Sequence, residues 1–316
     1  MKKSVILAAA LCLAGQANAV TIYGVDENNN LVTFDSSAPG MILSSVGISG
    51  IDNSLGALDF RPINGVLYGL GSDRVVYTIN TGTGAATAVS GVLALAGTNF
   101  AFDFNPTIDR LRIVSNTNDN YVFNPNDGSL TVATQVMYAA GDPNSGANPD
   151  ITAGAYTSSI FGAAAGTTQL YSIDTALDVL TTQENSAGTL NTVGSLGVDL
   201  GSRTSFDISG PDAFAFNDNN LYRVNLATGA LTSLGSTGRG LFGIAIAAPV
   251  PEPESWLLMI AGFAAIRLFN AQTGSWVLLT IVFVCRPNFG ATRQRLAQRI
   301  VGTVAGLVLT WALLQL

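Results

Sequence analysis

The sequence contains no histidine, and its only lysines, Lys2 and Lys3, lie at the amino terminus. The lack of imidazole excludes histidine-dependent triads, general bases and metal sites. The lack of internal lysine excludes a Schiff-base or phosphate-loop lysine. The two cysteines, Cys12 and Cys285, lie in apolar end segments, so the body has neither a disulfide framework nor a thiolate metal site. These absences argue against the common classes of enzyme.

Charge is also scarce, at 11% of 316 residues, against roughly 25% in typical soluble proteins. The formal net charge of −7 argues against nucleic acid as a partner. With 48% hydrophobic residues and 34 glycines, the composition is typical of a β-rich exported or membrane-associated protein. It does not identify a ligand.

Residues 1–19 have the pattern of a secretory signal. Lys2 and Lys3 provide the charged start, Val5–Ala14 the apolar core, and Ala17-Asn18-Ala19 the small-residue cleavage site. An uncleaved membrane helix is the alternative, but Val5–Ala14 is too short, because a bilayer needs about 20 apolar residues. We therefore expect the mature chain to begin at Val20 and to be exported to an oxidising compartment.

Residues 249–254 form a proline-rich stretch that works as a stiff spacer. The motif Val250-Pro-Glu-Pro253, followed by Ser255, an apolar run and Arg267, resembles the PEP-CTERM sorting signal. This resemblance implies a Gram-negative, exopolysaccharide-making source, and recognition by an exosortase, a membrane protease and transferase. The sequence departs from the family in having a single arginine there and more chain beyond it. The expected sorting residues are Pro251, Glu252, Pro253 and Ser255.

Residues 264–316 resemble part of the fusaric-acid-resistance-type inner-membrane proteins, on the run from Trp276 to Gly306. This covers only a fragment of such a transporter, so a transport function is not carried over, and a transport component would need more membrane segments. The two halves of 255–316 also conflict in membrane topology. The PEP-CTERM-type half places Arg267 on the inner side, and the transporter-like half places Arg286–Arg299 there too. Too few residues separate Arg267 from Arg286 for the chain to cross the membrane and return. We interpret the tail as a PEP-CTERM-type helix fused accidentally, by gene rearrangement or sequence assembly, to a partial membrane segment. It anchors the chain in the inner membrane.

Residues 20–248 contain a repeat of short aromatic or alternating strands separated by Gly, Asn and Asp turns. Three strand types recur. The first type comprises 21–24, 66–69, 110–113, 159–162 and 212–215. The second comprises 31–35, 76–80, 120–124, 170–174 and 221–225, each ending on Asp or Asn. The third comprises 57–60, 101–104, 154–156, 205–208 and 243–246.

Repeats of this length with about four strands each are typical of β-propeller blades. The sequence therefore predicts an all-β propeller of about five four-stranded blades over 20–248, followed by a short α-helical membrane tail. A sixth blade and a β-sandwich are the alternatives, although a sandwich does not require a period. The segments Asp103–Ser115, Asn124–Gly128 and Leu170–Val198 resemble the family called domain of unknown function 4394. That resemblance implies an exported propeller-like domain and no known activity.

Several turns are rich in Asp and Asn, which are the oxygen donors that Ca²⁺ prefers. The first of them offers Asp26, Asn28 and Asn30 as calcium candidates. The turn lacks EF-hand spacing, and Asn and Asp are also favoured in hairpin turns because they tolerate positive φ. We therefore favour structural turns and expect no cofactor.

Asp109, Arg110 and Arg112 form the densest charge cluster of the body, with Asp103 nearby. Arg110 and Arg112 share one strand face. They could form a small anion or sugar site at the central channel, or a buried ion pair that ties adjacent blades. We favour the ion pair.

Asp59, Asp103 and Asp207 recur at equivalent strand positions. Paired carboxylates can act as acid and base in glycoside cleavage. A catalytic pair is not normally repeated blade by blade, so recurrence favours a structural role.

Together these observations predict an exported, envelope-associated binding or matrix protein that is not an enzyme. Its propeller faces the periplasm or the outside, and exopolysaccharide or envelope components are candidate partners. The main alternative is a Ca²⁺-dependent propeller hydrolase or lactonase working with carboxylates and metal alone.

Overall fold

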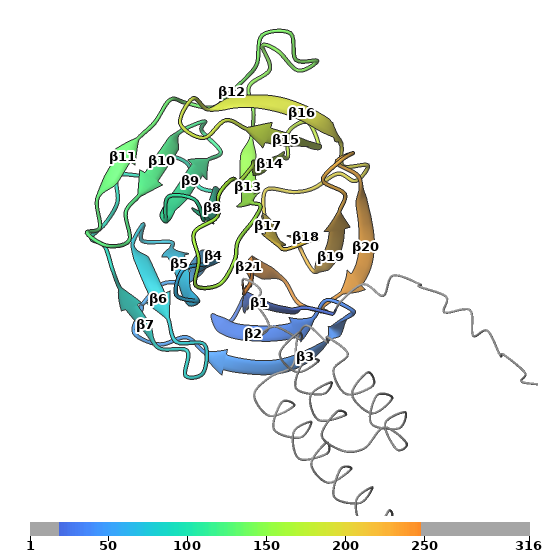
Figure 1. Cartoon of the computed structure of the whole chain (residues 1–316). Helices are drawn as coiled ribbons and strands as arrows, with labels where there is room; N and C mark the ends of the chain where they lie inside the picture. Colours follow the sequence, from blue (N-terminus) through green and yellow to red (C-terminus); the bar gives the residue numbers. More distant parts are fainter. Residues whose placement is uncertain (1–18, 248–316) are drawn as a thin grey trace, which may run out of the picture.

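A computed structural model describes residues 19–247 of the chain. The expected signal peptide, proline-rich spacer, sorting residues and membrane tail lie outside the described residues. Residues 19–247 form five β-sheets arranged around a central axis, which confirms the five-bladed propeller (Figure 1). Neither a sixth blade nor a pair of stacked sheets is found in this part of the chain. No helix in the same range is long and apolar enough to cross a bilayer.

We number the blades 1 to 5 and give their strands from the axis outward. Blade 1 contains β21 (Leu241–Ile246), β1 (Thr21–Asp26), β2 (Asn30–Asp35) and β3 (Ala38–Gly47). Blade 2 contains β4 (Leu55–Arg61), β5 (Val66–Gly71), β6 (Val76–Ile79) and β7 (Ala86–Ala88). Blade 3 contains β8 (Phe100–Asn105), β9 (Arg110–Ser115), β10 (Asn120–Phe123) and β11 (Leu130–Val132). Blade 4 contains β13 (Ile151–Tyr156), β14 (Leu170–Asp174), β15 (Val179–Gln183), β16 (Thr189–Ser195) and β12 (Met137–Tyr138). Blade 5 contains β17 (Thr204–Ser209), β18 (Asp212–Asn217), β19 (Asn220–Val224) and β20 (Leu231–Ser236).

The inner strands β21, β4, β8, β13 and β17 surround the axis and are almost fully buried (Figure 1). Their aromatic and branched side chains pack between the faces of neighbouring blades. Tyr68 of blade 2, for example, meets Phe104 of blade 3 edge to face, with ring centroids 5.0 Å apart. Such pairs add about 0.5–1.5 kcal/mol beyond the area they bury. The hydrophobic core therefore lies between blades, and this packing fixes the positions of the inner strands.

The ring closes in blade 1, where strands from both ends of the described chain pair. β21 lies antiparallel to β1, with Ile246 opposite Ile22 and Ala245 opposite Tyr23. Residues 20–247 thus contain every strand of the closed ring, so they can be produced as a separate domain, which we call the propeller domain.

Blade 4 departs from the sequence prediction in two ways. Segment 159–162, expected as a strand, lies in the loop between β13 and β14, with Ile160 and Phe161 partly exposed. β14 instead pairs directly with β13, because Leu170 and its neighbours supply the apolar alternation that packs beside the inner strand. In addition, β12 pairs parallel to β16 and adds a fifth, outermost strand.

The Asp/Asn-rich segments form the tight turns that the repeat predicted. Asn29, Asn118 and Asp218 adopt left-handed φ values of 57°, 71° and 54°. These residue types tolerate that conformation better than other side chains do. The turns join neighbouring strands within blades 1, 3 and 5.

Candidate functional site in the central channel

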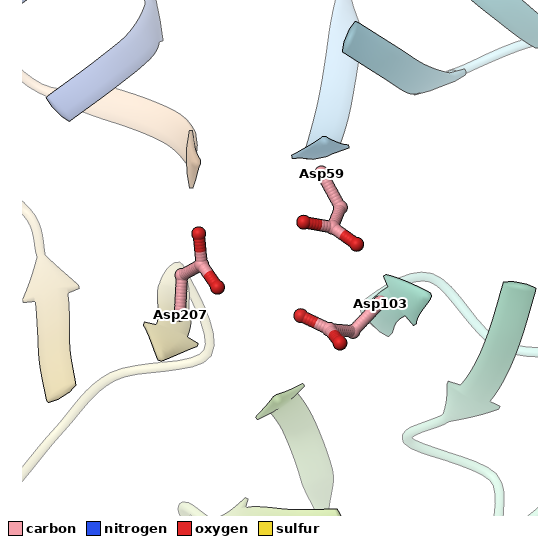
Figure 2. A group of neighbouring side chains, drawn as sticks. All are labelled: Asp59, Asp103 and Asp207. Carbon is pink, nitrogen blue, oxygen red and sulfur yellow. The ribbon is translucent and has the colours of Figure 1, made fainter. Parts of the chain in front are cut away.

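Three aspartates meet at the axis, one from each of three inner strands. Asp59 comes from β4, Asp103 from β8 and Asp207 from β17, and Figure 2 shows their carboxylates directed toward one another. Carboxylate oxygens of the three lie within 4.8 Å of one another. The side chains are deeply buried, with residue exposures of 5%, 4% and 3%. We call this group the aspartate trio.

Each carboxylate of the trio accepts a backbone N–H from the inner strand of the next blade around the ring. The three bonds are Phe104 N to Asp59 Oδ2 at 2.6 Å, Tyr156 N to Asp103 Oδ1 at 3.0 Å, and Ile246 N to Asp207 Oδ2 at 2.5 Å. Every member of the trio therefore ties its own blade to the following one.

The inner strands of the other two blades have no aspartate at this position. Blades 4 and 1 carry Ala155 and Ala245 at the equivalent position. An aspartate there would face a backbone N–H of the next blade, which is that of Ile208 for blade 4 and that of Phe60 for blade 1. Ile208 N donates instead to Oδ1 of its neighbour Asp207, at 2.6 Å. Three carboxyl groups thus satisfy one buried N–H from each of four inner strands, and each N–H would otherwise cost about 1–3 kcal/mol.

Burial raises the pKa of all three carboxyl groups and is the largest cause in each case. Repulsion from Asp207 raises the pKa of Asp59 further, and repulsion from Asp59 and Asp207 does the same for Asp103. The backbone hydrogen bonds act in the opposite direction. The pKa of Asp207 reaches about 7. The trio therefore holds protons well above the pH at which exposed carboxyl groups lose them.

The trio fits a structural role better than a metal site. Its oxygens are close enough to surround a cation, but Ca²⁺ requires six to eight oxygen ligands. Each of the three carboxylates also accepts a backbone N–H, whose positive end competes with a cation for the carboxylate charge. The geometry supports the structural role that recurrence in three blades predicts.

A pocket of about 390 Å³ opens at one end of the channel. It is lined by the first residues of the inner strands, including Leu55, Phe100 and Thr204, and by residues just before them. A second cavity of about 20 Å³ lies further along the same strands. Asp59, Asp103 and Asp207 come next along these strands, and none of them lines either cavity. We call the larger cavity the mouth pocket.

Two arginines line the mouth pocket, and each stacks on a phenylalanine. The guanidinium carbon of Arg74 lies 4.8 Å from the Phe100 ring centroid, and that of Arg203 lies 4.6 Å from the Phe242 ring centroid. Arg74 donates to the Gly97 carbonyl oxygen at 2.6 Å, and Arg203 donates to Glu27 at 2.9 Å. Stacking holds the guanidinium planes in place while leaving N–H groups for other acceptors.

The predicted charge cluster is dispersed in the structure. Asp109 pairs with Arg61 of blade 2, a residue that the sequence did not single out. Arg112 is buried and donates to Tyr156 Oη at 3.3 Å and to Asn120 Oδ1 at 2.8 Å. Arg110 donates to the carbonyl oxygens of Asp109 and Ile108, and Asp103 belongs to the trio. The ion pair between blades is therefore Arg61–Asp109, and the four predicted residues do not form one anion site.

The calcium candidates form a hydrogen-bonded turn. Asp26 Oδ1 accepts the backbone N–H groups of Asn28 and Asn30 at 3.0 and 2.9 Å. Asp26 Oδ2 accepts from Arg239 at 3.1 Å. Both oxygens of this carboxylate are thus used in holding the turn and in an ion pair.

Sequence reasoning missed Arg74, Arg203 and Thr152, which line the mouth pocket. A signal was available, because the residues that precede equivalent inner strands converge at one end of a propeller channel. Arg203 and Thr152 occupy such positions, immediately before or at the start of β17 and β13. Arg74 lies in the β5–β6 turn and carries no comparable signal.

The carboxy-terminal part of the chain matches the family model "Fusaric acid resistance protein-like" over residues 258–316. Over 53 residues it is 45% identical to "Inner membrane protein YccS" of Escherichia coli, covering 17% of this chain and 7% of that protein. It is 53% identical over 45 residues to an uncharacterized protein of Haemophilus influenzae, covering 14% and 6%. The chain thus spans only a small fraction of the curated relatives it matches, and the resemblance of the tail to this family is confirmed.

Among solved structures, the chain is similar to one described as "Crystal structure of Nidogen/Laminin Complex". The TM-score is 0.45 at 11% identity, over 72% of this chain and 98% of that one. A structural genomics protein of unknown function from Bacteroides thetaiotaomicron gives a TM-score of 0.44 at 13% identity, over 73% and 67%. The family model described as domain of unknown function (DUF4394) matches residues 30–245, which is most of the propeller. The chain, a five-bladed propeller with an aspartate trio at its axis, therefore belongs to the DUF4394 family.

Proposed function

We propose that the protein is a non-catalytic binding protein of the bacterial envelope and that the mouth pocket is its ligand site. The observation that carries the proposal is the division of the channel. The open end holds a pocket of about 390 Å³ with two arginines and several hydroxyl and amide side chains. The carboxylates that could act as acid and base line neither this pocket nor the second cavity, and they bond backbone N–H groups. Pockets of roughly 300–1,000 Å³ are typical of small-ligand sites.

The terminal segments support the location. Residues 1–19 have the pattern of a secretory signal, and 250–267 resemble a PEP-CTERM signal read by an exosortase. Residues 258–316 match an inner-membrane family. In this proposal the propeller is exported and held at the envelope, where it binds exopolysaccharide or another envelope component.

A pocket-filling substitution tests the proposal. A Cβ built on Gly56 meets nothing nearer than the Leu70 carbonyl oxygen, at 3.9 Å, so Gly56→Phe is expected to fold and to fill the mouth pocket. Gly91→Phe is the matched control, since a Cβ on Gly91 meets nothing within 4 Å and Gly91 does not line the pocket.

The purified propeller domain is incubated with cell-free exopolysaccharide and with washed envelopes of the source bacterium, and retained protein is quantified. We expect wild type and Gly91→Phe to be retained and Gly56→Phe to be lost. Equal retention of Gly56→Phe would place the binding surface elsewhere. Release of reducing sugar by the wild-type domain would contradict the non-catalytic assignment.

A further inference from the structure

Arg74 is a half-buried cation that has no carboxylate partner within residues 19–247. Its side chain stacks on Phe100, and its one hydrogen bond among the described residues goes to the Gly97 carbonyl oxygen at 2.6 Å. Its Nη1 atom is buried and has no partner in residues 19–247. Buried or partly buried charges are normally paired, because removing a charge from water costs several kcal/mol. Arg74 lines the mouth pocket, so its incompletely paired guanidinium suits an anionic oxygen bound there.

The charge of the mouth pocket is opposite to that of the molecule around it. Residues 20–248 carry 19 acidic side chains and 7 arginines. Two of those seven arginines line the pocket, and no acidic side chain does. Arg203 lies at the exposed rim, where its bond to Glu27 is solvent-screened and leaves other N–H groups free for a ligand. A local positive site on an acidic protein attracts anions in preference to the surrounding surface.

Thr152 provides an independent sign of a ligand. Its side chain lines the mouth pocket, the residue is 2% exposed, and Oγ1 is without a hydrogen-bond partner among the described residues. A buried hydroxyl without a partner is unfavourable, because it has lost its hydrogen bonds to water. It lies on β13, between the strands that carry Phe100 and Thr204. Further hydroxyl and amide groups around the opening come from Ser54, Ser72, Thr98, Asn99, Ser202 and Thr204.

We propose that the mouth pocket binds a uronic acid unit, that is, a sugar ring bearing a carboxylate. This inference rests on the proposed function and names its ligand class. The carboxylate lies against the guanidinium edges of Arg74 and Arg203, and the sugar hydroxyls bond Thr152 Oγ1 and the polar rim. An inorganic anion would satisfy the arginines but leave most of the polar lining of a 390 Å³ pocket without partners. A neutral sugar would leave Arg74 unpaired.

The first experiment compares three probes on the wild-type propeller domain by isothermal titration calorimetry at low ionic strength: glucuronate, glucose and inorganic phosphate. We expect saturable binding of glucuronate, at least tenfold tighter than that of glucose or phosphate, and weakened by added salt. Equal affinity for glucose would overturn the anionic assignment. Equal affinity for phosphate would identify a general inorganic-anion site and overturn the sugar assignment.

Substitutions then test the residues. Arg74→Gln should weaken glucuronate binding at least tenfold, whereas Arg110→Gln, at the other end of the channel, should leave it unchanged. Arg74→Lys, which keeps the charge but not the guanidinium fork, should lie between them. Unchanged affinity in Arg74→Gln would refute the proposal, and equal losses in Arg74→Gln and Arg110→Gln would reduce it to a long-range charge effect.

Thr152→Val separates binding from folding. Valine has the same shape but no hydroxyl, so the melting temperature should be unchanged or higher while glucuronate binding weakens severalfold. Unchanged binding in Thr152→Val would remove the hydroxyl from the site and refute that contact.

The two proposals fail in different ways. If polysaccharide retention is lost in Gly56→Phe but glucuronate does not bind, the mouth pocket remains the ligand site and only the uronate assignment fails. If Gly56→Phe changes neither retention nor glucuronate binding, both proposals fail.

Discussion

The aspartate trio predicts an unusual dependence of stability on pH. A carboxyl group whose pKa is higher in the folded state binds more protons folded than unfolded, so its contribution to stability is complete below the unfolded pKa and is lost as pH rises. For Asp207 the window runs from the ordinary value of 3.8 to about 7. This difference corresponds to about 4 kcal/mol at most. Asp59 and Asp103 shift in the same direction.

Other carboxyl groups act with the opposite sign. Hydrogen bonds lower the pKa of Asp73 and Asp142, so their contribution is present above the unfolded value and is lost as the solution becomes more acidic. We therefore expect maximal stability of the propeller domain at mildly acidic pH, and a decrease of a few kcal/mol between pH 5 and pH 8.

Two substitutions in the trio should behave differently. Asp103 accepts one N–H, from Tyr156, and asparagine preserves that acceptor while removing a charge. Asp103→Asn should therefore flatten the pH dependence and raise stability at pH 8. Asp207 accepts from both Ile208 and Ile246, and asparagine offers only one acceptor oxygen. Asp207→Asn should lose about 1–3 kcal/mol, even at pH 5, for the N–H left unpaired.

The assay is urea unfolding of the propeller domain followed by far-ultraviolet circular dichroism at pH 5, 6.5 and 8, since all three tryptophans lie outside residues 20–247. The midpoint concentration and slope give the free energy of unfolding. A free energy that rises from pH 5 to pH 8, or an Asp103→Asn domain with an unaltered pH dependence, would refute the assignment of raised pKa values to the trio.

Three further outcomes are expected. Arg61→Met should destabilise the propeller domain by roughly 2–3 kcal/mol, because it leaves Asp109 without its partner. Arg203→Met, which breaks an exposed ion pair, should cost under about 1 kcal/mol in the same urea assay. Equal costs of the two substitutions would argue against a stabilising ion pair between blades 2 and 3. Chelator treatment should leave the melting temperature unchanged, because both oxygens of Asp26 already accept hydrogen bonds; a drop of several degrees would indicate a bound cation. Intact mass of the exported protein should show loss of residues 1–19, and a retained amino terminus would contradict the signal peptide.

The fold was largely predictable because each blade repeats one chemical pattern. The strand containing Asp59 and that containing Asp207 each place the aspartate between an aliphatic residue and a phenylalanine, and both become inner strands. The prediction failed where local pattern and tertiary packing disagree. Segment 159–162 has the apolar residues of a strand, but the space beside β13 is taken by β14. A short motif does not specify which strand pairs with β13 when a long loop separates the two strands.

The candidate site was less predictable, because its residues come from different blades. Arg110 and Arg112 are close in sequence and therefore conspicuous, yet Arg110 bonds neighbouring carbonyl oxygens and Arg112 bonds Asn120 and Tyr156. Arg74 and Arg203 are isolated in the sequence, and only closure of the ring brings them to one pocket. The recurrence of the trio was visible from sequence, but its bonding to the following blades depends on the circular order of the inner strands.

Closure of the ring by β21 also has a mechanical consequence. The inner strands all run from the mouth pocket toward the opposite end, so the chain leaves β21 at Ile246, on the side away from the pocket. The tail therefore continues from the end of the propeller opposite the pocket. Tension between a bound polymer and the tail then acts along β21. Its ladder with β1 is antiparallel and lies along this direction, so the force shears several hydrogen bonds at once instead of opening them singly from one end.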